Sequence, residues 1–473
     1  MAGDTPRRAV VVGGGISGLA AAWELSGGAH KSPAPPQIVL MESSDRLGGA
    51  LRTAMFGGRL VDVGPDGFLG RRPEAFELCQ EVGLGDTLVP IAGRGAAVVV
   101  RGRVRMLPDG LVLGVPTRFW PAARSGLLGL RGQLGLARDV LVPRPDRRGP
   151  IGDRSIGPLV ARKLGRRVVD TLVDPLMGGI HAGSTDDMSA AATFPVLLAA
   201  AQRRGSLMRA LRAEVPVPAA DAPPLFWTLS GGMESLTERL GDVLNERGVE
   251  IRRSAPVERL ERTGGRWGVH ANGTVTEADG VVLALPATPT SLLLHGHDDE
   301  VVGLLNGIEY ASVTLVTFRV DAESVPAPLK GTGFLVPRRS HPSRGSDAWA
   351  VTACTYLDQK WPHLARDGEV LLRASLGRSD DGRAAGWSDA DVCDRAWSEL
   401  STFMGLTGTP LESMVVRFPD SLPQYRVHHL LRTTGIESAV ARLGGLSVAG
   451  AAYCGVGIPA CIASGRAAAR SLW

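Results

Sequence analysis

The chain has 473 residues, and its 52 Lys and Arg against 48 Asp and Glu give a formal net charge of +4. Its length predicts two or three domains, and its composition, 44% hydrophobic and 21% charged, is typical of a globular protein. The near balance of charge argues against nucleic-acid binding. The five cysteines form no C-x-x-C pair, which argues against a disulfide framework or a metal site and for a reducing compartment. Apolar stretches stay short of the roughly 20 residues of a transmembrane helix, so we expect no transmembrane segment.

The first predicted elements are a strand, a glycine-rich turn and a helix. Residues 9–12 form a β-branched run typical of a buried parallel strand, and residues 16–25 are helix-like. The glycines between them have the G-x-G-x-x-G spacing of a dinucleotide-binding turn, which permits a tight turn, approach of a pyrophosphate and close helix packing. The helix N-terminus then offers free N–H groups to the phosphates. The residues expected to hold the cofactor here are Gly13, Gly14, Gly15, Ile16, Ser17 and Gly18.

A second strand is predicted at residues 37–41, and it ends in Glu42, where a carboxylate binds a ribose hydroxyl. The following residues, "ESSDRLGG", resemble the second fingerprint of FAD-dependent enzymes in the amine-oxidase superfamily. That resemblance changes the expected cofactor from any dinucleotide to noncovalently bound FAD. The contacts that it implies are from Ser43, Arg46, Gly48 and Gly49.

Later segments are predicted to return to the same domain: a helix opened by a glycine pair at 228–236, strands at 254–262 and 278–287, and a strand, turn and helix at 445–470. We expect Val257 to lie near the adenine and the strand at 278–287 to end at Pro286. A helix beginning near Ile458, next to Val456 and Gly457, would direct its N-terminus at the flavin ring, where negative charge develops on reduction.

Motifs along the chain carry a more specific resemblance. They are "VVVGGGISGLAAA", "ESSDRLGG", "VDVGPDGFLGRR", "LVDPLMGGIHAGSTDDMSAAATFP", "VTACTYLDQKWPH", "DSLPQYRVHH" and "YCGVGIPACIASG". Over nearly its whole length, the chain resembles the protoporphyrinogen and coproporphyrinogen oxidases of the soluble Gram-positive type. The resemblance implies an α/β fold with a Rossmann-like, discontinuous FAD-binding domain, a substrate domain with an antiparallel sheet, and an inserted helical lobe. The expected limits are 1–91, 216–300 and 419–473 for the FAD domain, 92–116 and 301–418 for the substrate domain, and 117–215 for the lobe.

The reaction implied by the resemblance is the six-electron oxidation of coproporphyrinogen III to coproporphyrin III in haem biosynthesis, with O2 as acceptor and H2O2 as by-product. Because the flavin N5 carries the hydride, no side chain is assigned as a catalytic residue, although His181 is a candidate. Further implied cofactor contacts are Gly64, Pro65, Asp66, Gly67 and Phe418, and implied substrate contacts are Arg71, Gly179, Ile180 and His181. Arg338 and Arg339 are further candidates for binding the substrate carboxylates, with a solvated surface position as the alternative.

Four positions depart from the pattern of relatives. Ala96 stands where eukaryotic members carry a propionate-binding Arg, and Phe418 stands where close relatives have Trp beside the flavin. Ala460 replaces an Asp, and Gly70 replaces a Glu. Ala96 argues against the mode of substrate binding seen in eukaryotic members. Ala460 predicts that the flavin is bound somewhat differently than in relatives with Asp.

Other functions stay open at this point. Protoporphyrinogen IX is the alternative substrate, and a flavin amine oxidase is a more distant alternative because Tyr453 could form half of an aromatic cage. A phytoene-type desaturase would lack the DPLMGGIHAG segment, and a noncatalytic FAD or porphyrin carrier would produce no peroxide. The expected partners are a porphyrinogen, O2 and, transiently, a ferrochelatase. In membrane-bound relatives the lobe docks on the bilayer. Because no strong apolar anchor stands out here, we favour a cytoplasmic protein and leave peripheral membrane contact open.

Overall fold

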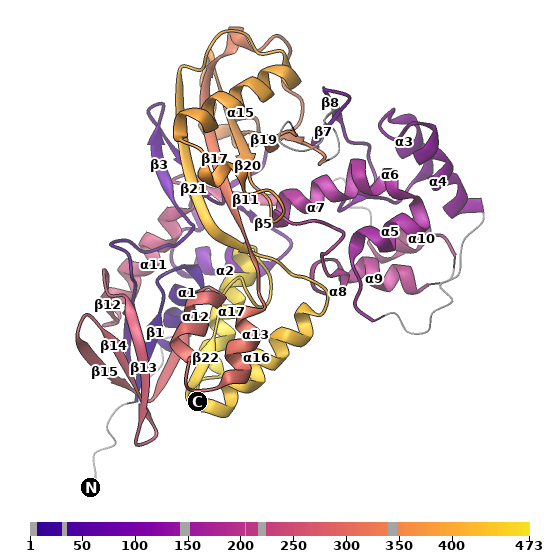
Figure 1. Ribbon diagram of the computed structural model, residues 1–473. Coiled ribbons are helices and arrows are strands. Elements are labelled where there is room, and N and C mark those ends of the chain that lie inside the picture. The colour runs from indigo at the N-terminus through magenta and orange to yellow at the C-terminus, as the bar shows by residue number, and fades with distance from the viewer. Residues whose placement is uncertain (1–6, 31–35, 142–151, 204, 216–223, 339–347) are drawn as a thin grey trace.

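The computed structural model describes residues 7–30, 36–141, 152–203, 205–215, 224–338 and 348–473. Figure 1 shows three parts: a parallel sheet enclosed by helices, a larger sheet above it, and a helical lobe to one side. The fold class is therefore α/β with both parallel and antiparallel strands, as the sequence predicts.

The parallel sheet is assembled from distant parts of the chain, and all its neighbouring strands are parallel. In spatial order its strands are β12 (Glu250–Arg252), β2 (Gln37–Met41), β1 (Arg8–Val12), β16 (Gly280–Leu283) and β22 (Leu446–Val448). Residues 9–12 are buried because helices cover one face of the sheet, and the antiparallel strands at residues 257–278 cover the other together with further helices. The strand predicted to end at Pro286 ends earlier, at Leu283. Pro286 instead caps the next helix, α12 (Ala287–Leu294), whose first turn suits the fixed φ of proline.

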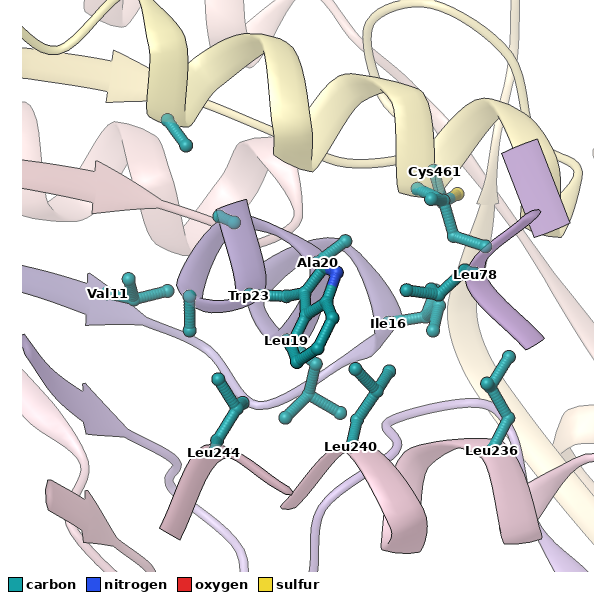
Figure 2. Close-up of a cluster of buried hydrophobic side chains, with 14 of the residues drawn as sticks. Val11, Ile16, Leu19, Ala20, Trp23, Leu78, Leu236, Leu240, Leu244 and Cys461 are labelled. Atoms are coloured by element: carbon teal, nitrogen blue, oxygen red, sulfur yellow. The ribbon is translucent and has the colours of Figure 1, made fainter. Parts of the chain in front are cut away.

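Helix α1 (Ile16–Leu25) packs between two others, α11 (Glu234–Glu246) and α17 (Ile458–Arg470). Figure 2 shows Leu240 and Leu244 of α11 directed at Leu19 and Trp23 of α1. Leu236 lies on the side of Ile16 and Leu78, and Cys461 of α17 lies on the opposite side from α11. α1 and α17 approach so closely that a Cβ on residue 465 would lie 2.0 Å from a backbone oxygen of α1. This contact explains why the last helix of the chain is rich in small residues.

The larger sheet has seven described strands, antiparallel except for one parallel pair, β18 with β7. In spatial order its strands are β21 (Glu412–Pro423), β17 (Tyr310–Asp321), β20 (Glu369–Leu376), β19 (Val351–Tyr356), β18 (Gly333–Leu335), β7 (Ala97–Val100) and β8 (Arg103–Met106). Helix α15 (Asp389–Met404) covers this sheet, and the short α14 (Leu357–Lys360) follows β19. The side chains of β7 alternate, with Val98 and Val100 in the core of the lobe and Ala97 and Val99 in the core of the sheet.

The helical lobe has its own hydrophobic core. Its elements are α3 (Phe119–Arg124), α4 (Gly129–Leu141), α5 (Ile156–Leu164), α6 (Arg166–Val168), a π-helical turn (Val169–Val173), α7 (Asp174–His181), α8 (Ala190–Thr193), α9 (Pro195–Gln202) and α10 (Leu207–Glu214). Helix α7 lies where the lobe meets the large sheet (Figure 1). Two predicted domain limits fall inside elements: 300/301 inside α13 (Asp299–Asn306) and 418/419 inside β21.

Smaller elements complete the described chain. They are β3 (Thr53–Phe56), β4 (Arg59–Asp62), β5 (Phe68–Leu69), α2 (Pro73–Glu81), β6 (Leu88–Pro90), β9 (Leu111–Val112), β10 (Val115–Pro116), β11 (Phe226–Leu229), β13 (Val257–Thr263), β14 (Arg266–Ala271), β15 (Thr274–Ala278) and α16 (His429–Leu443). Within the described ranges, none of the helices combines the length and apolarity needed to cross a bilayer.

Candidate active site

The glycine-rich turn after β1 is shaped by steric limits. Gly13 has a φ of +106°, and a Cβ on Gly18 would lie 1.8 Å from the Gly13 carbonyl oxygen. A side chain at Gly15, by contrast, would meet no atom within 4 Å. Gly15 therefore presents bare backbone to open space at the N-terminus of α1. The first N–H groups of that helix have no acceptor within it.

The carboxylate of Glu42 lies against this turn. Its Oε2 accepts a 2.6 Å hydrogen bond from the backbone N–H of Gly14, and its Oε1 accepts bonds of 2.8 Å from both the N–H and the hydroxyl of Ser44. The Ser43 hydroxyl donates to the same Oε1 at 3.2 Å. The N–H of Ala255 donates to the Glu42 carbonyl, which brings the start of β13, with Val257, to the end of β2. These predicted residues therefore share one edge of the parallel sheet.

Gly48 and Gly49 lie against the glycine-rich turn. Residues 13–18 together with Gly48 and Gly49 are called the glycine cradle below. The N–H of Gly48 donates to the Gly14 carbonyl at 2.9 Å, and a Cβ on Gly49 would lie 3.3 Å from the Cα of Gly15. Arg46 stabilises the Gly48–Gly49 segment. Its guanidinium donates a hydrogen bond to the Gly49 carbonyl at 2.5 Å and forms an ion pair with Glu234 at 3.0 Å. Glu234 opens α11 and was not singled out from the sequence.

Asp66 is bound by residues of α14, of the turn after it and of β20 in the larger sheet. Its carboxylate lies 3.0 Å from Lys360 Nζ, from the indole N–H of Trp361 and from the Arg373 guanidinium. Burial alone would raise the pKa of Asp66, but the charges of Arg373 and Lys360 hold it well below its usual range. Arg373 also donates to the Gly64 carbonyl at 3.1 Å. The predicted segment Gly64, Pro65, Asp66, Gly67 is thus fixed to β20 and α14 through partners that the sequence did not reveal.

Phe418 and the C-terminal turn lie on the same side of the fold. A Cβ on Gly64 would lie 3.4 Å from the Phe418 ring, so the two predicted residues are neighbours. The last predicted helix begins as expected, with Gly457 as the N-cap of α17. Ile16 at the start of α1 lies beside Cys461 in the first turn of α17 (Figure 2). Two helix N-termini therefore meet at this edge and make it favourable for negative charge.

Ala460 fits closely into this turn. It is 4% exposed, and a Cβ on Gly455 would lie 2.8 Å from the Ala460 Cβ. Gly455 and Ala460 are thus a matched pair of small residues. Gly455 therefore limits the space for a side chain larger than Ala at position 460.

Three of the four predicted substrate residues, Gly179, Ile180 and His181, form the last turn of α7. Gly179 and Ile180 are exposed, with 45% of Ile180 accessible. His181 is half-buried, its Nδ1 is buried without a hydrogen-bond partner among the described residues, and desolvation lowers its pKa to about 4. His181 is therefore neutral at pH 7. A neutral imidazole in apolar surroundings suits contact with a macrocycle better than capture of a carboxylate.

The candidate arginines differ in availability. Arg71 is exposed in the turn between β5 and α2, and its side chain pairs with none of the described residues. Arg338 is occupied, because its guanidinium donates to the Gly183 carbonyl at 2.6 Å and pairs with Asp174 and Asp380. Arg339 lies outside the described residues. Arg71 thus remains the accessible candidate, whereas Arg338 fastens the end of α7.

Comparisons with known proteins agree with this geometry. The sequence matches the family of flavin containing amine oxidoreductases over residues 16–472. It is 32% identical to coproporphyrinogen III oxidase of Bacillus subtilis (strain 168), with 98% of this chain and 97% of that protein covered. It is 32% identical to human protoporphyrinogen oxidase, with 98% of each chain covered. A solved structure from Exiguobacterium sp. 255-15 superposes with a TM-score of 0.88 at 34% identity, over 99% of both chains.

The glycine cradle fits a flavin dinucleotide on structural grounds. Gly15 leaves open the kind of space that a diphosphate needs, Gly48 and Gly49 lie against the same turn, and the Glu42 carboxylate borders it, as a ribose-binding acid would. Among the residues that the structure describes, no group of three or more His, Cys, Asp or Glu is arranged to hold a metal. The chain is a flavin-dependent oxidoreductase and belongs to the flavin containing amine oxidoreductase family.

Proposed function

We propose that the protein binds FAD noncovalently and oxidises coproporphyrinogen III to coproporphyrin III in haem biosynthesis, with O2 as the electron acceptor. The observation that carries this proposal is the open backbone at Gly15 within a chain that matches coproporphyrinogen III oxidases over its full length. The reaction removes six electrons and six protons from the macrocycle. Three O2 molecules take them up and leave as three H2O2. FAD, when bound, supplies the two-electron chemistry.

The chain's own groups bind and orient the reactants. Backbone N–H groups after Gly15 would hold the diphosphate, Glu42 would hold the ribose, and the N-terminus of α17 would stabilise the negative charge that develops on the flavin. Phe418 of β21 lines the same region beside Gly64. On the substrate side, the exposed last turn of α7, at Ile180, offers an apolar surface to the macrocycle, and Arg71 binds a propionate.

Protoporphyrinogen IX is the nearest alternative substrate, since a protein so named is also similar over the whole length. A flavin amine oxidase is less favoured, because Tyr453 is 2% exposed and packs in the core between the parallel sheet and α12. Its hydroxyl faces Thr290 of α12. Tyr453 is therefore poorly placed to form an aromatic cage around a substrate.

The experiment is a peroxide count. Coproporphyrinogen III prepared without oxygen is added to the purified FAD-loaded protein, O2 is admitted, and porphyrin fluorescence and peroxide are followed together. Three H2O2 for each coproporphyrin III, at a rate proportional to enzyme, support the proposal. Porphyrin formed only at the rate of the protein-free control would contradict it and would favour the carrier alternative.

The proposal includes a cytoplasmic location with contact to a membrane surface through the helical lobe. Four apolar side chains are strongly exposed on α3 and α4: Trp120 (63%), Leu130 (79%), Leu134 (70%) and Leu141 (77%). Four exposed arginines accompany them: Arg118, Arg124, Arg131 and Arg138. Residues 94–141 contain eight Arg and two Asp, a net charge of +6, and one of these acids, Asp139, is buried as a cap of α10. Exposed apolar side chains among arginines suit an anionic lipid surface. Passing the product to a ferrochelatase remains a prediction.

A further inference from the structure

Tyr425 stabilises the loop at residues 451–455, which leads into α17. It follows β21 and is buried, and its hydroxyl donates to the Ala451 carbonyl at 2.5 Å while it accepts from the Gly455 N–H at 2.7 Å. One hydroxyl therefore holds both ends of the loop formed by residues 451–455. Helix α17 begins at Ile458, three residues after the end of this loop, so the hydroxyl of Tyr425 restrains the segment that leads into the helix.

The ring of Tyr425 is itself fixed by a neighbour. His429, in the first turn of α16, stacks on it with ring centroids 3.8 Å apart and planes 15° apart, and His429 is fully buried. The His429 ring faces the backbone carbonyls of Ala452 and Tyr453 in the same loop. The His429 ring and the Tyr425 hydroxyl therefore both face the same five-residue segment, residues 451–455.

The short segment that contains Gln424 and Tyr425 also contacts the end of α7, on the proposed substrate side. The side-chain amide of Gln424 donates to the His181 carbonyl at 2.9 Å, at the C-terminal end of α7. A Cβ on Gly183 would lie 2.4 Å from the Gln424 amide oxygen, so this side chain is in tight contact with the turn after α7. The Tyr425 carbonyl accepts a 2.8 Å hydrogen bond from the N–H of Ser189 in the lobe. Two consecutive residues therefore connect the end of α7 to the loop before α17.

We infer that Gln424 and Tyr425 are positioning residues that set the spacing between the end of α7 and the loop at 451–455. This inference rests on the proposed function, in which α7 contacts the substrate and the loop leads to the flavin. Hydride transfer needs reacting atoms about 3–3.5 Å apart, and a misplacement of about 1 Å can cost about 100-fold in rate. A rigid link of two residues between the two sides meets that requirement.

The first variant is Tyr425→Phe, which keeps the stacked ring and removes the hydroxyl. We expect faster amide exchange at residues 451–455 in the FAD-free protein and a roughly 10-fold weaker FAD affinity, since two loop hydrogen bonds are lost. With bound FAD saturated, anaerobic flavin reduction should slow at least about 10-fold while the substrate KM stays within about twofold. The matched control is Tyr356→Phe, which removes a hydroxyl from another buried tyrosine, in β19, and should leave all these quantities unchanged. Unchanged loop exchange and unchanged FAD affinity in Tyr425→Phe would overturn the inference.

The second variant is Gln424→Leu, which releases the His181 carbonyl. We expect slower flavin reduction with FAD affinity unchanged, because this contact lies on the substrate side. If the two residues set one spacing, the double variant should be little slower than the slower single variant. Rate losses that multiply in the double variant, to within about twofold, would contradict a shared role. Loop exchange and FAD affinity need no porphyrinogen, so they test the inference even if coproporphyrinogen III proves not to be the substrate.

Discussion

The carboxylate of Glu42 accepts a hydrogen bond of 2.6 Å from the backbone N–H of Gly14, and this contact joins the end of β2 to the glycine turn after β1. Residues that are 28 positions apart thereby form one rim around the space in front of Gly15. The charge of Glu42 both orders the turn and stands at the ribose end of the proposed cofactor site.

Replacing Glu42 with Gln should weaken FAD binding by about 10- to 100-fold, because hydrogen bonds to a charged acceptor are worth about 1.5–3 kcal/mol. Titration of the FAD-free protein, followed by flavin fluorescence, measures the change. Glu250→Gln, an exposed carboxylate at the start of the neighbouring strand β12, is the matched control and should bind FAD like the wild type. Equal affinity in both variants would contradict the assigned role.

The variants Gly15→Ala and Gly18→Ala should distinguish an effect on FAD affinity from an effect on the stability of the fold. A methyl group on Gly18 collides with the Gly13 carbonyl oxygen, so this variant should lose at least about 2 kcal/mol of unfolding free energy. A methyl group on Gly15 meets no protein atom, so FAD-free stability should change by less than about 1 kcal/mol while FAD affinity falls sharply. Urea unfolding and FAD titration check both. Unchanged FAD affinity in Gly15→Ala would show that the diphosphate lies elsewhere.

Asp66→Asn should destabilise the fold rather than the cofactor complex. The substitution leaves the charges of the half-buried Lys360 and the buried Arg373 without their counter-ion, at a cost of about 3–5 kcal/mol. Urea unfolding of the FAD-free protein measures this loss. Molecules that remain folded should bind FAD with nearly wild-type affinity, because the carboxylate already has three protein partners. A selective loss of FAD affinity without loss of stability would contradict this expectation and support the direct cofactor contact that the resemblance implies for Asp66.

Two histidines with lowered pKa values, the half-buried His181 and the buried His429, should make the protein acid-sensitive. Burial lowers the pKa of both His181 and His429 to about 4 from an ordinary value of 6.5. Between these values the unfolded chain binds protons that the folded chain does not, so stability falls as the pH drops from about 6.5 to about 4. Each histidine contributes a loss of about 2 kcal/mol between pH 7 and pH 5.

His429→Phe keeps the ring stacked on Tyr425 and removes one of these titrations. The difference in unfolding free energy between pH 7 and pH 5, measured with urea, should shrink by about 2 kcal/mol. His295→Gln, at an exposed histidine, is the control and should leave the difference as in the wild type. An unchanged pH dependence in His429→Phe would argue against the burial of a neutral imidazole at this position.

The exposed leucines of α4 should control binding to anionic vesicles. Leu130→Gln combined with Leu134→Gln should reduce the vesicle-bound fraction in sedimentation by at least about 10-fold, since burying a leucine side chain is worth about 1.5–3 kcal/mol. Leu292 and Leu431, 73% and 72% exposed outside the lobe, provide the control pair for the same change to Gln. Binding that depends equally on the two pairs, or is absent in the wild type, would count against membrane contact through the lobe.

Local features of the sequence predicted the cofactor-side elements well. β1, the glycine turn, α1 and β2 follow one another within about 40 residues, so periodicity and glycine spacing are enough to place them. The start of α17 at Ile458 was likewise predicted from an adjacent glycine turn and proline. These elements depend on contacts between near neighbours in the chain.

The partners that fix the site were not predictable in this way. Glu234 pairs with Arg46 across 188 positions, and Lys360 reaches Asp66 across 294. Such pairs form only when segments far apart in the sequence pack together, and no local pattern marks them. Tyr425 lies in the quoted segment "DSLPQYRVHH", yet its link to Gly455 depends on how β21 meets the loop before α17. The exposed apolar side chains of α4 also became visible only once the other faces of that helix were packed.

The central claim is tested most directly by comparing kcat/KM for coproporphyrinogen III and protoporphyrinogen IX on the FAD-loaded protein, with porphyrin fluorescence and peroxide measured together. The account predicts a higher kcat/KM for coproporphyrinogen III, and a reduced preference in Arg71→Met, because Arg71 is proposed to bind a propionate. A higher kcat/KM for protoporphyrinogen IX, or no peroxide from either porphyrinogen while FAD remains bound, would contradict it.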